Sequence, residues 1–155
     1  MDNVSVEQTL GRSLYLAHRA VHEELDRRLY EYGASVWNWV LLREAAHASR
    51  DNAPGASQRE LADLMGIEPP TLVRHLDKLA EEGLVERRPD ADDRRVVRVV
   101  VTKAGRKRLA QLHAVVHELD TELRGALTVR DVDVLQRALT HVYEHFTEEV
   151  ASGRS

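Results

Sequence analysis

The amino-acid sequence predicts a mainly α-helical fold with a small β-hairpin, of the class α+β. Three observations support this expectation. Apolar residues recur every three or four positions at both ends of the chain, two short helical segments in the middle meet at a glycine, and a run of β-branched residues comes after them. The 155 residues, of which 43% are hydrophobic, suffice for one compact domain or for two small lobes with a shared core.

Two helices are expected in the first third of the chain. The first has an amphipathic stripe with spacings of 4, 3, 4 and 4, formed by Leu10, Leu14, Ala17, Val21 and Leu25. This stripe predicts a helix from about Val6 to Tyr30 that stops near Gly33. Ser35 is suited to cap a second helix. That helix ends before the turn-rich segment 50–55 and carries the apolar residues Val36, Trp39, Val40 and Leu42.

Two more helices are expected at the far end of the chain. The apolar residues of the first are Leu109, Leu112, Val116, Leu119 and Leu123, and those of the second are Val132, Leu135, Leu139, Val142 and Phe146. Gly125 and Thr128 separate them, which predicts an antiparallel helical hairpin. Its apolar seam is either intramolecular core or a surface for a partner. A long helix at each terminus, with little else to cover it, favours a dimer.

Residues 57–83 predict a helix-turn-helix between these terminal helices. The segment Ser57–Glu60 has the spacing of a capping box, in which the serine hydroxyl accepts from a backbone N–H and the glutamate reaches back. The helix that begins there is expected to stop at Gly66. A second helix is expected from Pro70 to about Glu82, because proline suits the first turn of a helix, and to end at Gly83.

The second of these helices separates its residues into two faces. We expect Leu72, Val73, Leu76 and Leu79 to pack inward and a polar stripe to be presented outward, formed by Thr71, Arg74, His75 and Lys78. Such side chains can reach phosphates and base edges in a DNA major groove. A polar helix face is more often merely solvated, so the interpretation depends on the segment after Gly83.

A strand pattern comes directly after the second helix. Residues 84–87 and 96–101 are expected to pair as a hairpin around a turn at 89–93. A helix-turn-helix with such a hairpin immediately after it is a winged helix-turn-helix. The sequence therefore predicts a DNA-binding region at 34–102, with dimerisation helices at 1–33 and 103–155.

The charge of the chain is distributed unevenly. The formal net charge is −4, but residues 84–108 carry nine basic and four acidic side chains, whereas residues 109–155 carry four basic and eight acidic ones. A basic middle on an acidic protein is the pattern expected of a local nucleic-acid contact. Arg94 or Arg95 at the hairpin tip can enter a minor groove, where negative potential is concentrated. Asp93 is expected to hold the guanidinium group in a fixed pose.

Several classes of protein do not fit the composition. The sequence has no cysteine, which excludes disulfides, thiolate metal sites and thiol chemistry. It shows neither a secretory signal nor an apolar run of the length that a membrane span needs, so we expect a cytoplasmic protein. Phosphate-binding glycine loops and a nucleophile elbow are missing too, so we expect neither an enzyme nor a cofactor.

Three segments resemble the MarR/SlyA family of transcriptional regulators: Gly66–Arg74 with Leu76-Asp77, Glu82–Val85, and Asp93-Arg94-Arg95 with Val101-Thr102 closing the second strand. The resemblance extends from about Leu10 to Phe146. It implies a homodimer whose two winged lobes bind a palindromic operator in double-stranded DNA, usually as a repressor. The residues then expected to lie at the DNA are Arg59, Pro70, Thr71, Arg74, His75, Lys78, Arg87, Asp93, Arg94 and Arg95. Among these, Arg87 is expected near the DNA backbone. Pro69 departs from the family pattern, in which a polar residue is common.

The resemblance also implies a small-molecule effector, because many members respond to small aromatic or phenolic acids. Trp39 is then a candidate to stack on an aromatic ring, and Arg43 or Arg19 to pair with a carboxylate. The alternative is that Trp39 belongs to the core and both arginines are ordinary surface residues.

Two alternative functions are also compatible with the sequence. His113 and His117 have the i, i+4 spacing of a metal-binding pair, on the helix where zinc-responsive relatives place theirs. Val40, however, stands where such relatives supply another histidine, so polar-face or interface histidines are the preferred interpretation. The second alternative is a winged module that binds protein and not DNA.

Overall fold

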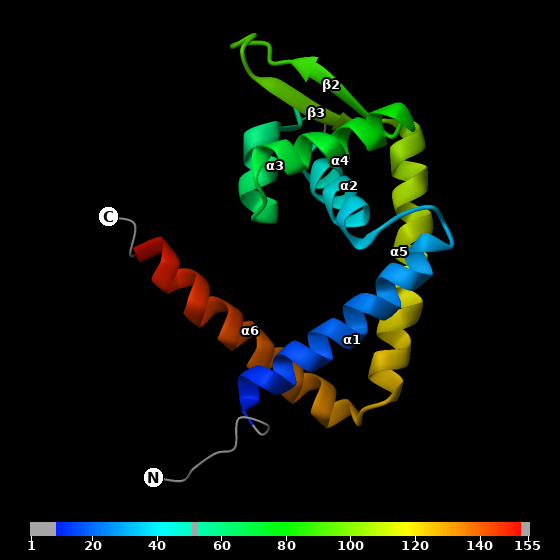
Figure 1. Cartoon of the computed structure of the whole chain (residues 1–155), viewed down its shortest axis with the longest axis vertical. Coiled ribbons are helices and arrows are strands. Elements are labelled where there is room, and N and C mark those ends of the chain that lie inside the picture. Colours follow the sequence, from blue (N-terminus) through cyan, green and yellow to red (C-terminus); the bar gives the residue numbers. More distant parts are fainter. Residues whose placement is uncertain (1–8, 51–52, 153–155) are drawn as a thin grey trace. The chain divides into compact units, whose positions relative to one another are not determined.

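The computed structural model of the chain describes residues 9–50 and 53–152. Along this part of the chain the order of elements is α1 (Leu10–Tyr30), α2 (Val36–Ala48), β1 (Ala56–Ser57), α3 (Gln58–Met65), α4 (Pro69–Glu81), β2 (Val85–Pro89), β3 (Val97–Val101), α5 (Lys103–Gly125) and α6 (Val129–Ser152). The helices and the strand hairpin are labelled in Figure 1. The expected mainly helical fold with a small β-sheet is confirmed.

The chain divides into two compact units, Met1–Val116 and His117–Ser155. The first contains α1 to β3 and the beginning of α5, and the second contains the end of α5 and α6. Within the described residues no helix is both long and apolar enough to span a membrane.

Short polar caps set the beginnings of the first two helices. The Thr9 hydroxyl accepts from the backbone N–H of Arg12, so α1 begins at Leu10; the expected start at Val6 lies outside the described residues. Ser35 caps α2 as expected, accepting from the N–H of Asn38 over 3.2 Å.

The sheet has three antiparallel strands in the order β1-β3-β2. The third strand, β1, was not expected, because two residues are too few to show an alternating pattern. It begins directly after Gly55, whose φ is 85° and whose α-carbon faces the backbone oxygen of Val99 so closely that an added Cβ would lie 2.3 Å from it. A side chain is therefore not tolerated at this point without a shift of the backbone.

The two strands of the hairpin differ slightly from the sequence prediction. Strand β2 includes Pro89, which we expected in the turn and which instead pairs with Val97. Proline has no backbone N–H to donate, but β2 is an edge strand of this sheet, where proline is tolerated.

The helix-turn-helix forms as predicted. Ser57 and Glu60 make the complete capping box, and Gly66 ends α3 in the left-handed conformation with φ of 61°. Helix α4 begins one residue earlier than expected, with both prolines in its first turn.

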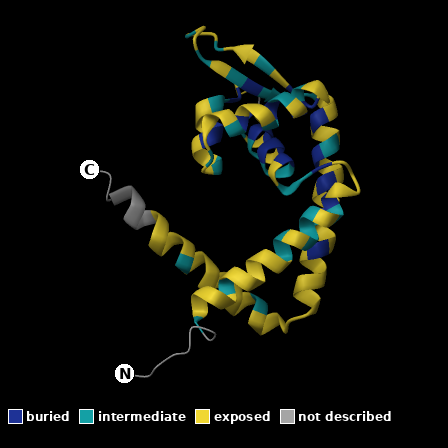
Figure 2. Cartoon of the chain, in the orientation of Figure 1, coloured by how far each residue is buried: buried dark blue, intermediate teal, exposed yellow. Residues whose placement is uncertain are grey.

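The core of the first unit lies beneath the hairpin, among α2, α3, α4 and the sheet (Figures 1 and 2). Leu72, Leu76 and Leu79 of α4 are buried there. Truncation of such a residue to alanine typically costs about 2–5 kcal/mol. Val73, which we expected on this inward face, is 38% exposed, so that part of the prediction is wrong.

The two long C-terminal helices are also capped by threonines. The Thr102 hydroxyl accepts from the N–H of Gly105 at the start of α5, and Thr128 accepts from the N–H of Asp131 at the start of α6. Gly105 is packed so tightly that an added Cβ would lie 2.0 Å from the backbone oxygen of Leu84.

The apolar stripe of α6 remains exposed in the single chain (Figure 2). Leu135, Leu139 and Phe146 of this stripe are exposed, whereas Val132 and Val142 are half-buried. Tyr143 lies beside the stripe and is 70% exposed, and Phe146 is 62% exposed. Within the second unit, a groove of about 190 Å³ between the end of α5 and α6 is lined largely by leucines and Val132. Within the second unit, these side chains are therefore not covered by the end of α5.

Candidate DNA-binding surface

Helix α4 presents cationic side chains on its solvent side. Arg74 and Lys78 lie one turn apart and are exposed, and Pro70 is exposed at the beginning of the helix. Within the described residues no hydrogen bond or ion pair occupies Arg74 or Lys78. The buried leucines beneath fix which way this face points, so both cations are available to an anionic partner.

His75 belongs to a different environment from its neighbours in the predicted polar stripe. It is half-buried, and its Nδ1 lies 3.0 Å from Oδ1 of the buried Asn38 in α2. The ring of Trp37 stacks near it, with centroids 6.3 Å apart. Burial is the main cause that lowers the pKa of His75, and the charges of Arg74 and Lys78 lower it further. The expectation of one continuous outward stripe therefore needs correction at this residue.

Arg87, which is expected near the DNA backbone, makes contacts with α4 in the structure. Its Nη1 donates to Asp77 Oδ1 over 2.7 Å, and its Nη2 lies 3.4 Å from the carbonyl oxygen of Val73. Its buried Nε has no hydrogen-bond partner among the described residues. The guanidinium group thus joins β2 to the solvent side of α4, and its effect on DNA contact is expected to act through the position of that helix.

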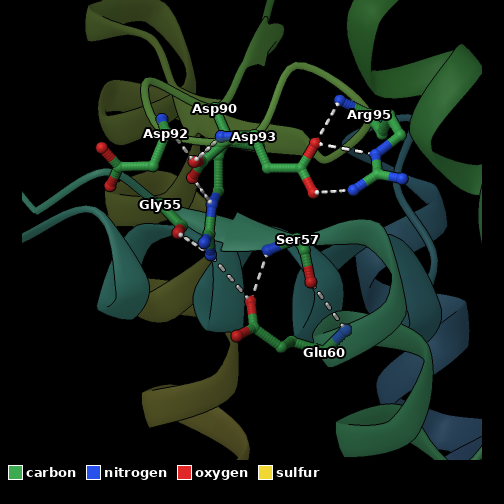
Figure 3. Close-up of polar contacts among 8 residues, drawn as sticks. Gly55, Ser57, Glu60, Asp90, Asp92, Asp93 and Arg95 are labelled. Carbon is green, nitrogen blue, oxygen red and sulfur yellow. Dashed lines mark hydrogen bonds and ion pairs between the residues drawn. The ribbon is translucent and has the colours of Figure 1, made fainter.

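The wing is the hairpin of β2 and β3, and its tip is the turn between them. At this tip the Asp93 carboxylate is hydrogen-bonded to Arg95 (Figure 3). The carboxylate accepts from the backbone N–H and from Nε of Arg95 through Oδ1, over 3.0 and 3.1 Å, and from Nη2 through Oδ2 over 3.3 Å. The Arg95 side chain hydrogen bonds are the main cause that lowers the pKa of Asp93, so the carboxylate stays charged. The contact predicted between Asp93 and a tip arginine is present, and the arginine is Arg95.

The guanidinium group of Arg95 remains open to a ligand despite this contact. The side chain is 91% exposed. Its neighbour Arg94 is exposed too, and within the described chain no hydrogen bond or ion pair occupies it. Arg59 is exposed near the start of α3. The first unit therefore presents cations on α3, on α4 and on the wing tip.

A second polar cluster, between the wing turn and the start of α3, was not predicted from the sequence. Arg98 of β3 donates to Asp90 and to Glu60, and Asp90 in turn accepts from the backbone of the wing turn. The hydrogen bond from Arg98 is the main cause that lowers the pKa of Asp90, to about 2, and the two backbone N–H groups contribute. The alternating position of Arg98 in its strand was the only available signal, because its partners lie 8 and 38 residues away.

The candidate effector residues have partners within the first unit. Trp39 packs against the core, and within the described part of the chain its buried Nε1 has no hydrogen-bond partner. The guanidinium carbon of Arg43 lies 5.0 Å from the Trp39 ring centroid, and Arg43 also pairs with Glu44 over 2.6 Å. Arg19 makes an exposed ion pair on α1, and among the described residues no contact joins it to Trp39 or Arg43.

His113 and His117, the candidate metal-binding pair, have separate contacts in the described part of the chain. No group of three or more histidine, aspartate or glutamate side chains there is arranged to hold a metal ion. His113 lies edge-on to Trp39, with centroids 6.1 Å apart, and His117 contacts Thr121 on its own helix.

The helix-turn-helix, the three-stranded sheet and the cationic wing together define a winged helix-turn-helix protein. Residues 51–97 match the sequence model of the MarR family. The whole fold resembles that of a mutant MarR from E. coli complexed with operator DNA. The two are 28% identical, with a TM-score of 0.74 and coverage of 86% of this chain and 92% of that chain.

Two relatives with bound small molecules are also similar to this chain. CouR from Rhodococcus jostii, bound to p-coumaroyl-CoA, is 25% identical, with a TM-score of 0.74 and coverage of 90% of this chain and 94% of that chain. A MarR family protein from Mycobacterium tuberculosis, in complex with p-aminosalicylic acid, is 25% identical, with a TM-score of 0.69 and coverage of 86% and 98%. The resemblance predicted from the sequence is confirmed: residues 51–97 match the MarR family model, and the fold is that of MarR-family winged-helix transcription regulators.

Proposed function

We propose that this regulator binds a palindromic operator as a homodimer and represses transcription, without catalytic activity of its own. The observation that carries the proposal is the pair of unoccupied cations on α4, Arg74 and Lys78, in the same unit as the braced Arg95 of the wing. A helix of this kind fits a major groove, and a wing arginine fits the adjacent minor groove. As a transcription regulator, it would act in the cytoplasm.

The roles of the individual residues are assigned from their environments. Pro70, Thr71, Arg74 and Lys78 are proposed to face the major groove, and Arg59 and Arg94 to contact phosphates. Arg95 is proposed to enter the minor groove. His75 and Arg87 are proposed to orient α4, because both are tied to neighbouring elements.

The experiment that tests DNA binding starts from a random pool of duplexes. The full-length protein should enrich a palindromic sequence, with two half-sites about one helical turn apart. A winged module that binds protein alone would enrich no duplex over the starting pool.

The homodimer is proposed from the exposed apolar stripe of α6. Leucine, tyrosine and phenylalanine side chains are exposed on one face of this helix, and their burial would stabilise an assembly. A second copy of the chain has the same apolar stripe and can cover them. The predicted dimerisation region, residues 1–33 and 103–155, contains this helix. Sedimentation of the full-length protein should give twice the mass of the chain.

An aromatic or phenolic acid is proposed as the effector, with Trp39 and Arg43 as its contacts. Support comes from the cation above the Trp39 ring and from Nε1 of that ring, for which the described residues offer no hydrogen-bond partner. A ligand changes operator affinity only if it binds two states of the dimer with different affinities. Salicylate and p-coumarate should raise the melting temperature and weaken operator binding; if neither changes, the effector proposal fails. A Zn²⁺ titration of the same complex tests the alternative that rests on His113 and His117.

A further inference from the structure

Arg98 of β3 lies at the centre of a polar network between the wing turn and the start of α3. Its Nε donates to Asp90 Oδ2 over 2.6 Å, and its Nη1 donates to Glu60 Oε2 over 3.1 Å. Nη1 also lies 3.4 Å from the carbonyl oxygen of Gly55. The side chains of Arg98 and Asp90 are 24% and 12% exposed, so this ion pair is better shielded than the other ion pairs of the wing.

Each of the two carboxylates also accepts hydrogen bonds from backbone N–H groups. Glu60 Oε2 accepts from the N–H of Ser57 over 2.6 Å and so closes the capping box of α3. Asp90 Oδ1 accepts from the N–H groups of Asp92 and Asp93, over 2.9 and 3.0 Å. Arg98 therefore connects the first turn of α3 to the backbone of the wing turn.

The same turn carries the side chain that holds the tip arginine. Asp93 donates its backbone N–H to Asp90 and accepts from Arg95 with its carboxylate. A continuous series of hydrogen bonds thus runs from Glu60 through Arg98, Asp90 and Asp93 to Arg95. In each hydrogen bond of the series at least one partner is ionised. Such hydrogen bonds are stronger than those between two neutral groups.

We propose that Arg98 is a positioning residue for DNA binding: it fixes the wing turn to the start of α3, so that Asp93 presents Arg95 in one pose. The inference rests on the proposed operator binding and adds to it a residue outside the DNA contacts. Arg98 acts through Arg95 because its Nε and Nη1 already donate to carboxylates, and its charge is balanced by two acids. A flexible wing would have to be ordered at the moment of binding, which weakens affinity.

The test is a double-mutant cycle on the palindromic duplex that the wild-type protein enriches from a random pool. The variants are Arg98→Gln, Arg95→Ala and the two combined. If Arg98 acts through Arg95, Arg98→Gln weakens binding about 10-fold in the wild-type background, on the scale of coupling between residues in one network. In the Arg95→Ala background it has almost no further effect.

Arg88→Gln is the matched control. Arg88 lies opposite Arg98 in the hairpin register, and its exposed ion pair with Glu86 takes no part in the network. It removes the same charge from the neighbouring strand, so its effect should add to that of Arg95→Ala. If the effect of Arg98→Gln is equally additive, Arg98 contacts DNA by itself and the proposal is overturned.

A second variant covers the case in which Arg98→Gln fails to fold. Asp90→Asn keeps an oxygen for the N–H groups of Asp92 and Asp93 but loses the charge that pairs with Arg98. It should also fail to add to Arg95→Ala. Both variants should reduce the preference for an A·T-rich flank and keep the preference for the central bases of each half-site, because α4 is not disturbed. A role in stability alone would lower the melting temperature and leave the flank preference unchanged, which contradicts the proposal.

Hydrogen exchange without DNA separates this inference from the proposed function. In Arg98→Gln the amides of Asp92, Asp93 and Arg95 should exchange faster than in the wild type, while those of α4 keep their protection. Unchanged exchange at the wing turn overturns the positioning role whatever the DNA data show. A wild-type protein that enriches no duplex overturns the proposed function, and this inference with it.

Discussion

Asp93 accepts three hydrogen bonds from a single residue, Arg95, two residues further along the wing. An acid at a DNA-binding tip is unfavourable beside phosphates unless it has another task. The geometry gives it one, because the carboxylate holds both the backbone and the guanidinium group of Arg95 in place.

Replacement of Asp93 should therefore change the operator affinity in the direction opposite to the one predicted from charge alone. Asp93→Ala removes a negative charge near DNA, which alone should tighten binding. We expect weaker operator binding instead, close to the loss in Arg95→Ala, because the guanidinium group is no longer held. Titrations of both variants at several salt concentrations measure this. Tighter binding by Asp93→Ala would show that the carboxylate does not orient Arg95.

Arg87→Ala tests whether this arginine orients α4 or contacts phosphate. Loss of the hydrogen bonds to Asp77 and Val73 should lower the free energy of unfolding by roughly 1 kcal/mol. The salt dependence of operator binding should keep its slope, since no phosphate contact is lost. A slope smaller by about 1 would instead place Arg87 on the DNA backbone, as the sequence alone suggested.

The lowered pKa of His75 predicts a loss of stability in acid. The unfolded chain takes up the proton near the ordinary pKa of 6.5, whereas the folded chain does so only at lower pH. Acidification below 6.5 therefore favours the unfolded state, until the folded pKa is passed as well. Chemical unfolding of wild type and His75→Gln between pH 8 and pH 5 isolates this contribution. The wild type should lose more stability than the variant over this range, and parallel curves would contradict the burial of His75.

Leu139→Glu tests the proposed dimer surface. Leu139 is exposed on the apolar stripe of α6, so a charge there is harmless to a monomer but is forced into an apolar contact in a dimer. We expect the variant to sediment as a monomer or to dissociate at a much higher concentration than the wild type. His141→Glu, exposed on the opposite side of the same helix, adds the same charge outside the stripe and serves as a comparison. A dimer unaffected by Leu139→Glu would place the interface elsewhere.

Local signals made most of the fold predictable from the sequence. Ser35, the Ser57–Glu60 pair and Gly66 act through neighbours within three or four residues, so spacing alone identified their caps. The two-residue strand β1 gave no such signal, because its formation depends on pairing with Val99 and Arg98, more than 40 residues away.

The candidate site was predictable in its residue types but not in all its contacts. The brace between Asp93 and Arg95 spans two residues and was expected. The partners of His75 and Arg98 lie on other elements, 37 and 38 residues away along the chain, and their contacts are set by packing. Val73 was assigned to the wrong face because helical spacing does not decide residues at the boundary between faces.

The measurement that tests the central claim most directly is the base preference of wild type and Arg74→Ala on variants of the enriched operator. Arg74 is exposed on α4 and has no hydrogen bond or ion pair within the described residues. If it contacts a base, Arg74→Ala should cost about 1–3 kcal/mol on the best operator and relax the preference at one position of each half-site. Unchanged preference at every position, with or without a uniform loss of affinity, would contradict the claim that α4 recognises the DNA sequence.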